Sequence, residues 1–290
     1  MIESQKSYES SLYGILYLVP TPIGNLGDMT YRAVSTLKEV DLIAAEDTRH
    51  TQRLLNHFEI TTSQISFHEH NTQERIPQLL EVLKKGEDVA QVSDAGMPSI
   101  SDPGFELVQA CIQAGISVVP LPGANAGVTA LIASGLAPQP FTFIGFLKRK
   151  KKEQREQWEE LKNREETMIF YESPFRVKEM IHNLISVLGS ERSVVVCREL
   201  TKRYEEFIRG SAKEVFEWLE SHEVKGEICV IVAGNLNPEE EEKSAFPEDI
   251  KTHVEWLMNS QAISSKDAIK QVAQSRNIKK QTVYQAYHEL

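Results

Sequence analysis

One segment of this chain combines acidic side chains with residues that constrain the backbone. SDAGMPSISDPG (93–104) contains Asp94 and Asp102 together with two glycines and two prolines. We expect the glycines to let main-chain groups face a ligand, while the prolines hold the path of the chain rigid. Asp102 has a local explanation, because it can cap a helix that starts at Pro103. Asp94 has none, and its carboxylate could bind ribose hydroxyls or the amino group of an amino-acid-like ligand.

Four further loops place small or charged residues directly after an apolar run. AEDTRHT (45–51) offers two carboxylates and an arginine, charges suited to holding a substrate, although a capped and solvated loop also explains them. PLPGANAG (120–127) leaves room for a ligand at the start of a helix. VPTPIGN (19–25) and FYESPFR (170–176) have the same position relative to their strands. These loops are the first candidates for a ligand site.

Several common active-site signatures are missing from the sequence. The dinucleotide motif G-x-G-x-x-G, the phosphate-binding motif G-x-x-x-x-G-K-[ST] and the serine hydrolase motif G-x-S-x-G do not occur. His68-Glu69-His70 resembles a metal-binding pair on a strand, but no second cluster with ligand spacing accompanies it. We therefore expect neither a metal centre nor a serine nucleophile.

The elements that must position these loops alternate between short apolar runs and helical periodicity. This alternation favours an α/β architecture with mostly parallel strands, in which the loops after the strands' carboxyl ends collect the ligand site. Several strands are apolar along their whole length, as expected where both faces of a sheet are covered. We predict strands at 14–19, 41–45, 88–92, 117–120, 141–145, 167–171, 193–197 and 228–233, and helices at 76–84, 105–114, 126–134 and 175–188.

The chain divides at two places where the composition changes. One strand ends in PLPG near residues 120–123, and NPEEEEKSAFPED further on is a charged segment flanked by prolines. The predicted parts are an N-terminal tail (1–13), two α/β domains (14–122 and 123–236), an acidic linker (237–249) and a small helical tail (250–290).

The tail contains two amphipathic helices, at 266–275 and 281–289, joined by a turn at 276–279. This spacing resembles a helix-turn-helix. A helical pair that docks on the preceding domain has the same pattern, so RNA binding and packing both remain open. The residues expected on the two apolar faces are Ala268, Ile269, Val272 and Ala273 in the first helix and Val283, Tyr284, Ala286 and Tyr287 in the second.

The composition is that of a globular protein. Apolar residues make up 41% of the 290 residues, charged residues make up 26%, and no apolar run reaches the ~18 residues that a membrane helix needs. The first thirteen residues lack the apolar stretch of a signal peptide. Three widely spaced cysteines fit a reducing cytoplasm.

The formal net charge of −10 argues against a protein that coats nucleic acid indiscriminately. The charge is nevertheless uneven. Residues 148–155 hold six basic side chains and one acidic, and residues 263–290 hold five basic and two acidic. Two basic islands therefore interrupt an acidic chain, which favours an RNA partner that is accepted in one orientation.

Nine short segments follow one another in a specific order: GILYLVPTPIGN (14–25), VDLIAAEDTRHT (40–51), HEHN (68–71), DVAQVSDAGMPSISDPG (88–104), VVPLPGANAG (118–127), ASGL (133–136), FYESPFR (170–176), RELTKRYEE (198–206) and KGE (225–227). In this order they resemble the ribosomal RNA small subunit methyltransferase I family, which belongs to the tetrapyrrole methylase-like group of S-adenosylmethionine (SAM) enzymes. The resemblance covers about residues 12–236, and the helical tail also fits.

The resemblance implies two α/β domains of the tetrapyrrole methylase type, with SAM in the cleft between them, in a homodimer that uses no metal and no membrane. It also implies methylation of the ribose 2′-hydroxyl of a decoding-centre cytidine of 16S rRNA, in the small ribosomal subunit of the cytoplasm. Carried over position by position, it assigns cofactor contacts to Pro22, Ile23, Asp94, Ala95, Gly96, Pro98, Ala124, Asn125, Ala126, Phe170 and Tyr171.

Methyl transfer to a weakly acidic hydroxyl needs accurate positioning and benefits from a general base. The candidates for the base are Glu46, Asp47 and Glu199, while Arg49 or Lys202 could lower the pKa of the hydroxyl or hold a phosphate. The side chains expected to face the RNA are Lys150, Lys151, Lys152, His68, His70, Asn71, Arg176, Lys279 and Lys280.

Three positions depart from the family's usual motifs. Lys148 stands where proline is usual, Met97 stands where threonine is common, and Phe175 stands where histidine is usual. None of these changes removes a charged group from the expected SAM site. The change at Phe175 does weaken any case for a catalytic histidine there.

Two functions of other classes remain open. A small-molecule methylase of the same fold, acting on a tetrapyrrole or a similar ring, would leave the basic islands and the tail without a purpose. A nucleic-acid-binding protein without enzymatic activity would leave the glycine- and proline-rich loops unexplained. Binding of SAM discriminates the enzyme from the binding protein.

Overall fold

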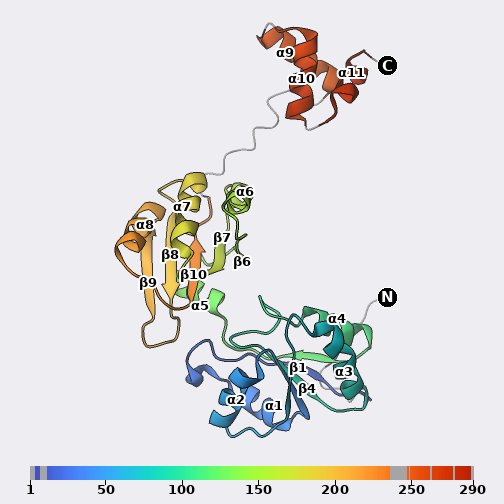
Figure 1. The fold of residues 1–290 in the computed structure, drawn as a ribbon, viewed down its shortest axis with the longest axis vertical. Coiled ribbons are helices and arrows are strands. Elements are labelled where there is room, and N and C mark those ends of the chain that lie inside the picture. The colour runs from blue at the N-terminus through green and yellow to red at the C-terminus, as the bar shows by residue number, and fades with distance from the viewer. Residues whose placement is uncertain are drawn as a thin grey trace. The chain divides into compact units, whose positions relative to one another are not determined.

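The computed structural model describes residues 4–6, 12–235, 247, 249–261, 263–276 and 278–288. The chain forms two compact units that divide between residues 236 and 237 (Figure 1). Most of the predicted N-terminal tail (1–13) and of the predicted acidic linker (237–249) lies outside the described residues, so both stay predictions.

The larger unit begins with a five-stranded sheet of order β3-β2-β4-β1-β5, in which every pairing is parallel. Leu37 and Leu55 pack on one face of this sheet, and Leu79 and Leu107 pack on the other. Both faces are covered, which explains why all four residues of β4 are buried. The elements are β1 (Leu16–Leu18), η1 (Leu26–Asp28), α1 (Tyr31–Glu39), β2 (Leu42–Ala45), α2 (Thr48–His57), β3 (Gln64–Ser66), α3 (Thr72–Lys84), β4 (Val89–Val92), α4 (Phe105–Gln113) and β5 (Val118–Pro120).

The unit continues with a second five-stranded sheet of order β6-β7-β10-β8-β9. Trp158, Met180 and Val215, from three different helices, pack on one face of this sheet, whereas Ala130 and Leu131 of α5 pack on the other. The elements are α5 (Ala126–Ser134), β6 (Phe141–Phe146), α6 (Lys151–Leu161), β7 (Thr167–Glu172), α7 (Val177–Leu188), β8 (Ser193–Arg198), β9 (Glu206–Ser211), α8 (Ala212–Ser221) and β10 (Ile228–Val232).

The α/β prediction is confirmed, but parallel pairing dominates only the first sheet. In the second, β6 pairs with β7 in parallel, whereas β10 runs antiparallel to β7 and β8, and β9 runs antiparallel to β8. A buried strand has the same apolar pattern in either direction, so the sequence could not distinguish them. Ile228 pairs with both Glu172 and Arg198. The carboxyl ends of β7 and β8 and the amino end of β10 therefore lie at the same end of the sheet.

Two strands were missed by the sequence prediction, and both lie at the edge of a sheet. No residue of β3 is fully buried, and β9 carries Glu206 and Arg209. Edge strands are short or charged because one side is open to solvent, so they lack the apolar signal of central strands. The four predicted helices are all present, with boundaries that shift by no more than a few residues.

The smaller unit has its own apolar core, which includes Val254, Ile269, Val272 and Val283. The two predicted tail helices are confirmed, and a third helix that the sequence analysis did not identify precedes them. Tyr284 was expected on the apolar face, but 48% of its surface is exposed. The helices are α9 (Ile250–Gln261), α10 (Ser265–Ser275) and α11 (Lys280–His288).

Candidate active site

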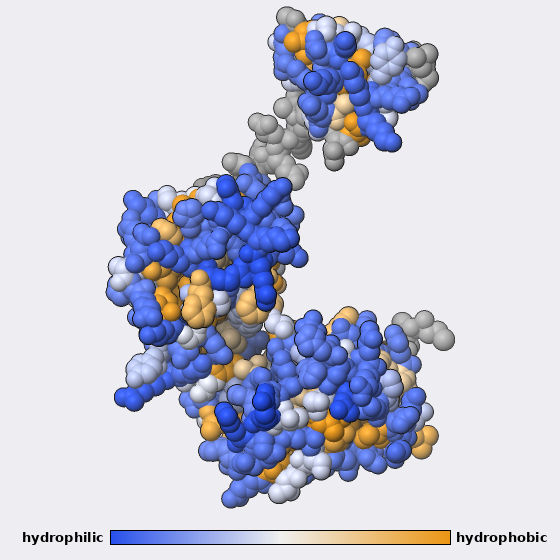
Figure 2. Space-filling model, in the orientation of Figure 1, coloured by the Kyte–Doolittle hydropathy of each residue, from blue (hydrophilic) through white to orange (hydrophobic). Residues whose placement is uncertain are grey.

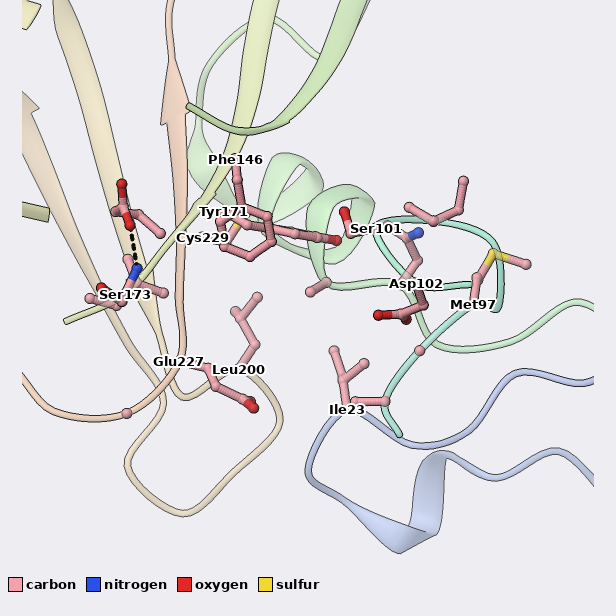
Figure 3. Close-up of a pocket in the computed structure, with 18 of the residues that line it drawn as sticks. Ile23, Met97, Ser101, Asp102, Phe146, Tyr171, Ser173, Leu200, Glu227 and Cys229 are labelled. Carbon is pink, nitrogen blue, oxygen red and sulfur yellow. Dashed lines mark hydrogen bonds between the residues drawn. The ribbon is translucent and has the colours of Figure 1, made fainter. Parts of the chain in front are cut away.

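A cavity of about 400 Å³ lies in the larger unit where loops from both sheets face each other. This volume falls within the range of small-molecule sites. Figure 3 shows Ile23, Met97 and Asp102 on one side of the cavity and Tyr171 and Leu200 across from them. We call the side built by residues 23, 95–97 and 100–102 the first wall. The second wall is built by residues 146, 171–174, 200 and 226–229.

The loops after β1 and β4 are joined below the first wall. The backbone groups of Thr21 and Gly96 exchange two hydrogen bonds of 3.0 Å, and the Thr21 hydroxyl donates to the Ser93 carbonyl. Both main-chain groups of Gly96 are therefore bonded to Thr21, although Gly96 itself lines the cavity, and a main-chain contact of this loop with a ligand stays a prediction. At position 104 the structure leaves no room for a side chain, because a Cβ there would lie 2.2 Å from Nε2 of Gln91.

Asp94 ties the loops after β2 and β4 together by two hydrogen bonds. The Asp47 amide donates to the Asp94 carboxylate, and the Asp94 amide donates to the Glu46 carboxylate, both at 3.2 Å. Asp94 is not part of the cavity lining. Its contact with a cofactor stays a prediction. Burial, together with the nearby Asp94 charge, raises the pKa of Glu46.

Asp102 is the carboxylate of this segment that lines the cavity. The predicted helix cap at Asp102 is wrong, because α4 begins at Phe105 and Gly104 occupies the capping position. Burial and the neighbouring charges of Glu46 and Asp94 raise the pKa of Asp102 to about 6, although the Ser93 hydroxyl works in the opposite direction. Sequence reasoning passed over Asp102 because a capping role offered a sufficient explanation.

The aromatic rings of Phe146 and Tyr171 line the second wall, and Phe143 packs beside Tyr171. The rings of Phe143 and Phe146 lie 5.1 and 5.9 Å from that of Tyr171, and the Tyr171 hydroxyl accepts a hydrogen bond of 3.1 Å from the Gly127 amide. Burial raises the pKa of Tyr171 to about 12, and the Asp102 charge contributes. The predicted cofactor contact at Phe170 is wrong for the side chain, because consecutive strand residues point to opposite faces and Phe170 packs in the core.

The remaining predicted cofactor residues divide into two groups. Asn125 and Ala126 line the cavity at the start of α5, where the Asn125 side chain accepts a hydrogen bond of 2.9 Å from the Val128 amide. The lining also contains Ile23, Ala95 and Gly96, whereas Pro22, Pro98 and Ala124 lie outside it.

Glu199 and Lys202 belong to an ion-pair network beside the second wall. The Lys202 ammonium lies 3.0 Å from the Glu199 carboxylate and 2.8 Å from that of Glu227, and the Glu227 amide donates to Glu199. Partial burial opposes both charges, but these contacts outweigh it, so the pKa of Glu199 is lowered and that of Lys202 is raised. Both groups are therefore fixed as ions at neutral pH.

Backbone strain is concentrated in the loops beside the cavity. Five non-glycine residues in the described part of the chain have φ angles between 51° and 69°, which such residues rarely adopt. Glu59 lies just after α2, whereas Ser99, Ser101, Glu199 and Thr201 belong to the two loops that carry Ile100 and Leu200 of the cavity lining. Strain of this kind persists where the surrounding structure fixes a functional geometry, at a cost of ~1–3 kcal/mol for each residue. No residue type marks these angles, so they could not be predicted from the sequence.

Asp47 and Arg49 pair with each other at the surface. Their side chains lie 2.9 Å apart, and Asp47 also caps α2 by accepting from the Arg49 amide. The Arg49 guanidinium holds the pKa of Asp47 well below its usual range. Asp47 is therefore the capping residue, and Thr48 is the first residue of the helix.

The HEHN turn is held together by its asparagine. The Asn71 side chain accepts from the His68 amide at 2.9 Å and donates to the Ser66 carbonyl at 3.2 Å. Asn71 therefore shapes the turn, and its role as an RNA contact stays a prediction. His70 is exposed, whereas His68 is partly buried beside Glu46.

Arg176 is also occupied within the protein. It lies 3.9 Å from the buried Glu172 carboxylate and donates to the carbonyls of Lys148 and Arg149. This arrangement fastens the start of the basic segment to the end of β7, and the contact of Arg176 with RNA stays a prediction. Lys150, Lys151 and Lys152 are exposed, but Glu153 and Glu156 pair with two of them.

Within the smaller unit, Lys279 and Lys280 are exposed at the start of α11. The half-exposed Tyr284 lies one turn further along the same helix. Two cations and an aromatic ring at one helix end are the groups that bind phosphates and stack on unpaired bases.

Neither a metal-binding cluster nor a membrane-spanning helix occurs among the described residues. They contain no group of three His, Cys, Asp or Glu side chains arranged to hold a metal ion. No helix among them is long and apolar enough to cross a membrane.

Comparison with known families gives a match over most of the larger unit. The family model described as Tetrapyrrole (Corrin/Porphyrin) Methylases matches residues 15–215. Curated relatives match over the whole length. A protein of Bacillus subtilis named ribosomal RNA small subunit methyltransferase I is 52% identical, with 99% of each chain covered. A protein of the same name from Synechocystis is 48% identical, covering 96% of this chain and 98% of its own.

Solved structures share the fold at low sequence identity. The methyltransferase CobJ has a TM-score of 0.60 at 18% identity and covers 76% of this chain and 94% of its own. A uroporphyrin-III C-methyltransferase from Thermus thermophilus, complexed with S-adenyl homocysteine, has a TM-score of 0.53 at 19% identity and covers 76% and 97%. Both proteins are methyltransferases by name.

Proposed function

We propose that this chain, which belongs to the tetrapyrrole methylase family and within it to the ribosomal RNA small subunit methyltransferase I proteins, transfers a methyl group from SAM to 16S rRNA. The acceptor is the 2′-hydroxyl of a decoding-centre cytidine ribose. The observation that carries this proposal is the 52% identity over 99% of the chain to a relative of that name. The reaction takes place in the cytoplasm, where the small ribosomal subunit is found.

The cavity has the chemistry that SAM requires. Ile23, Leu200 and Ile228 offer apolar surface for an adenine ring, and Asp102 offers a negative charge to a cationic ligand. The backbone of Ala95 and the start of α5 supply polar groups nearby. When bound, SAM supplies an electrophilic methyl group on a sulfonium sulfur. The related uroporphyrin methyltransferase structure, complexed with S-adenyl homocysteine, supports the same use of the fold.

The chain's own residues orient the two reactants. Lys202 holds Glu199 and Glu227 beside the second wall, which fixes the loop that carries Leu200. We assign Glu199 and Lys202 to positioning, because their charges satisfy each other. Glu46 is placed behind the first wall, bonded to the Asp94 amide. Asp47 and Arg49 stay exposed and are proposed to meet the RNA.

RNA contacts are proposed on both units. The exposed segment Lys150–Lys152 supplies cations on the larger unit, and Lys279 and Lys280 supply them on the smaller one. Reversing the charges of Lys279 and Lys280 should weaken rRNA binding at least tenfold and reduce its salt dependence, while leaving SAM affinity unchanged. Lys213→Glu, at an exposed position of α8, is the matched control. Unchanged RNA affinity would assign the tail to packing alone.

A homodimer is proposed through an exposed apolar face on α5 and β6. Val128 and Ile132 lie one turn apart on α5, and 74% of Ile132 is exposed. Phe141 and Phe143 on β6 are also exposed, and Phe143 lies close to Gly127 of α5. Figure 2 shows hydrophobic residues at the surface of this part of the larger unit. Ile132→Glu should convert the dimer to a monomer in light scattering, and a monomeric parent protein would contradict the proposal.

The function is tested by labelling small ribosomal subunits with methyl-labelled SAM. A 2′-O-methyl group blocks alkaline cleavage of the adjacent phosphodiester, so the label should appear in an alkali-resistant dinucleotide that begins with cytidine. Label in single nucleotides would indicate base methylation instead. Transfer to a tetrapyrrole but not to rRNA would favour the small-molecule methylase.

A further inference from the structure

The first wall contains one carboxylate that the positioning roles leave unused. We infer that Asp102 is the proton acceptor of the reaction, taking the proton from the acceptor hydroxyl as the methyl group is transferred. This inference rests on the proposed function and adds a catalytic residue to it. Figure 3 shows the Asp102 side chain pointing from its loop into the cavity, toward the second wall.

The other carboxylates near the cavity are less suited to this role. The Lys202 ammonium lowers the pKa of Glu199, and Glu227 is paired with the same ammonium. Glu172 also lines the cavity, but its carboxylate lies 3.9 Å from Arg176 and accepts a hydrogen bond of 2.8 Å from the Ser173 amide. Glu46 accepts from the Asp94 amide and does not line the cavity, and Asp94 does not line it either. Asp102 thus combines access to the cavity with a charge that no ion pair among the described residues satisfies.

The groups facing Asp102 come from both walls. Glu46 and Asp94 lie behind it on the first wall and disfavour its charge, and the Ser93 hydroxyl favours it. The Tyr171 hydroxyl and the Glu227 carboxylate belong to the opposite wall, and Lys202 stands beside Glu227. The pKa of Asp102 is raised to about 6, roughly two units above that of an ordinary aspartate, so it accepts a proton about a hundredfold more readily.

The charge of the cofactor makes this acceptor suitable for the reaction. A cation in the same cavity favours the ionised carboxylate, and loss of that cation raises the pKa of the carboxylate again. The acceptor oxygen loses its proton to an Oδ atom of Asp102 and forms a bond to the methyl carbon. The bond between the methyl carbon and sulfur breaks, and sulfur keeps the electron pair. One negative and one positive charge disappear together, so the cavity ends neutral at these two centres.

The first test compares Asp102→Asn with Glu106→Gln, an exposed control in the first turn of α4. The parent's single-turnover rate should fall below about pH 6, where Asp102 is protonated. Asp102→Asn should be slower by 10²-fold or more at pH 7.5, a loss typical of a missing general base. It should also lose this pH dependence. The control should retain both the rate and the profile.

The second test measures protons instead of turnover. Calorimetry of ligand binding at pH 6, in two buffers of different ionisation enthalpy, gives the number of protons released. SAM should release up to about half a proton from the parent protein, S-adenosylhomocysteine should release less, and Asp102→Asn should abolish the difference.

The outcomes separate this inference from the proposed function. A variant that keeps the parent's rate and pH profile, or releases protons like the parent, would overturn the role of Asp102. A variant whose SAM affinity falls as much as its rate would make Asp102 a cofactor ligand instead. A parent protein that does not bind SAM at all would overturn the proposed function itself.

Discussion

Carboxylates lie at both walls of the cavity, but their surroundings shift the pKa values of Glu199 and Asp102 in opposite directions. At the second wall, the lining residue Glu227 and the adjacent Glu199 share the Lys202 ammonium at distances of 2.8 and 3.0 Å. On the first wall, Asp102 lies near two further carboxylates, which raise its pKa to about 6. One wall therefore fixes its charges permanently, whereas the other keeps a carboxyl group that can exchange a proton near neutral pH.

This difference assigns the two walls different roles: the ion pairs beside the second wall hold a loop in place, and Asp102 of the first wall can accept a proton. A satisfied ion pair holds a loop in one geometry but has little tendency to accept a proton. A carboxylate surrounded by like charges is less stable in the folded protein, but it is a stronger base. Perturbed pKa values of this kind collect at functional sites. Each prediction below alters one wall and leaves the other unchanged.

The largest effect is expected from Gly226→Ala on the second wall. Gly226 has a φ of +89°, and a Cβ there would lie 2.2 Å from the Glu199 carboxylate, which is already bonded to Lys202. We expect a loss of ~3 kcal/mol in unfolding free energy and a tenfold or greater loss of SAM affinity. Chemical denaturation and calorimetry measure the two effects.

Gly135→Ala is the matched control for this substitution. Gly135 has a similar φ of +84°, but no atom lies within 4 Å of an added Cβ. Its cost should be only the backbone strain, ~1 kcal/mol, with normal SAM affinity. Equal losses in both variants would show that the Glu199 network has no special rigidity.

Lys202→Met should have the next largest effect on stability. Methionine keeps part of the aliphatic packing against Gly24 but leaves Glu199 and Glu227 without their cation. We expect a loss of ~1 kcal/mol at pH 7, because the pair is only partly buried. The lowered pKa of Glu199 stabilises the parent above the ordinary carboxyl value and is lost as the pH falls. The two proteins should therefore converge as the pH falls below the ordinary carboxyl range, through the lowered pKa of Glu199.

Lys225→Met provides the control, since Lys225 pairs with Glu223 in a fully solvated position. It should change stability by less than ~0.5 kcal/mol at any pH. A difference between Lys202→Met and the parent that does not depend on pH would place the loss in packing, not in the ion pairs.

Asp102→Asn is expected to change the unfolding free energy with the opposite sign. A raised pKa means that the folded protein binds the Asp102 proton more tightly than the unfolded chain does. The parent's stability should fall as the pH rises from about 4 to about 6. Asp102→Asn should therefore be more stable by ~1 kcal/mol at pH 7, after allowance for solvent screening, and equal to the parent at pH 4. Thermal unfolding at the two pH values tests this, and a destabilised variant at pH 7 would contradict it.

The sequence predicted the class of fold and the loops of the site because these leave local signals. Apolar runs marked the central strands, and glycine- and proline-rich segments marked the loops at their ends. The direction of β10 left no such signal, since both faces of that strand are buried in either direction. The edge strands β3 and β9 were missed because they lack the apolar pattern of central strands.

Within the site, residue type was a poor guide to orientation. Asp94 and Asp102 are eight positions apart in one loop, yet Asp94 bonds to the Asp47 amide and Asp102 lines the cavity. Phe170 and Tyr171 are adjacent, but only the latter lines the cavity. Arg176 and Asn71 were expected to face RNA, and the structure shows that the side chains of both donate hydrogen bonds to backbone carbonyls of the protein. These choices depend on contacts between distant segments, which the sequence does not display.

The contrast between the walls is measured most directly by carboxyl-carbon NMR on protein labelled at aspartate and glutamate. Asp102→Asn and Glu199→Gln assign the two signals. In the ligand-free protein we expect Asp102 to titrate with a pKa near 6 and Glu199 to titrate below the ordinary carboxyl range. Titration of Asp102 near pH 4, or of both groups at the same pH, would contradict the account, in which Asp102 exchanges a proton near neutral pH and Glu199 stays ionised.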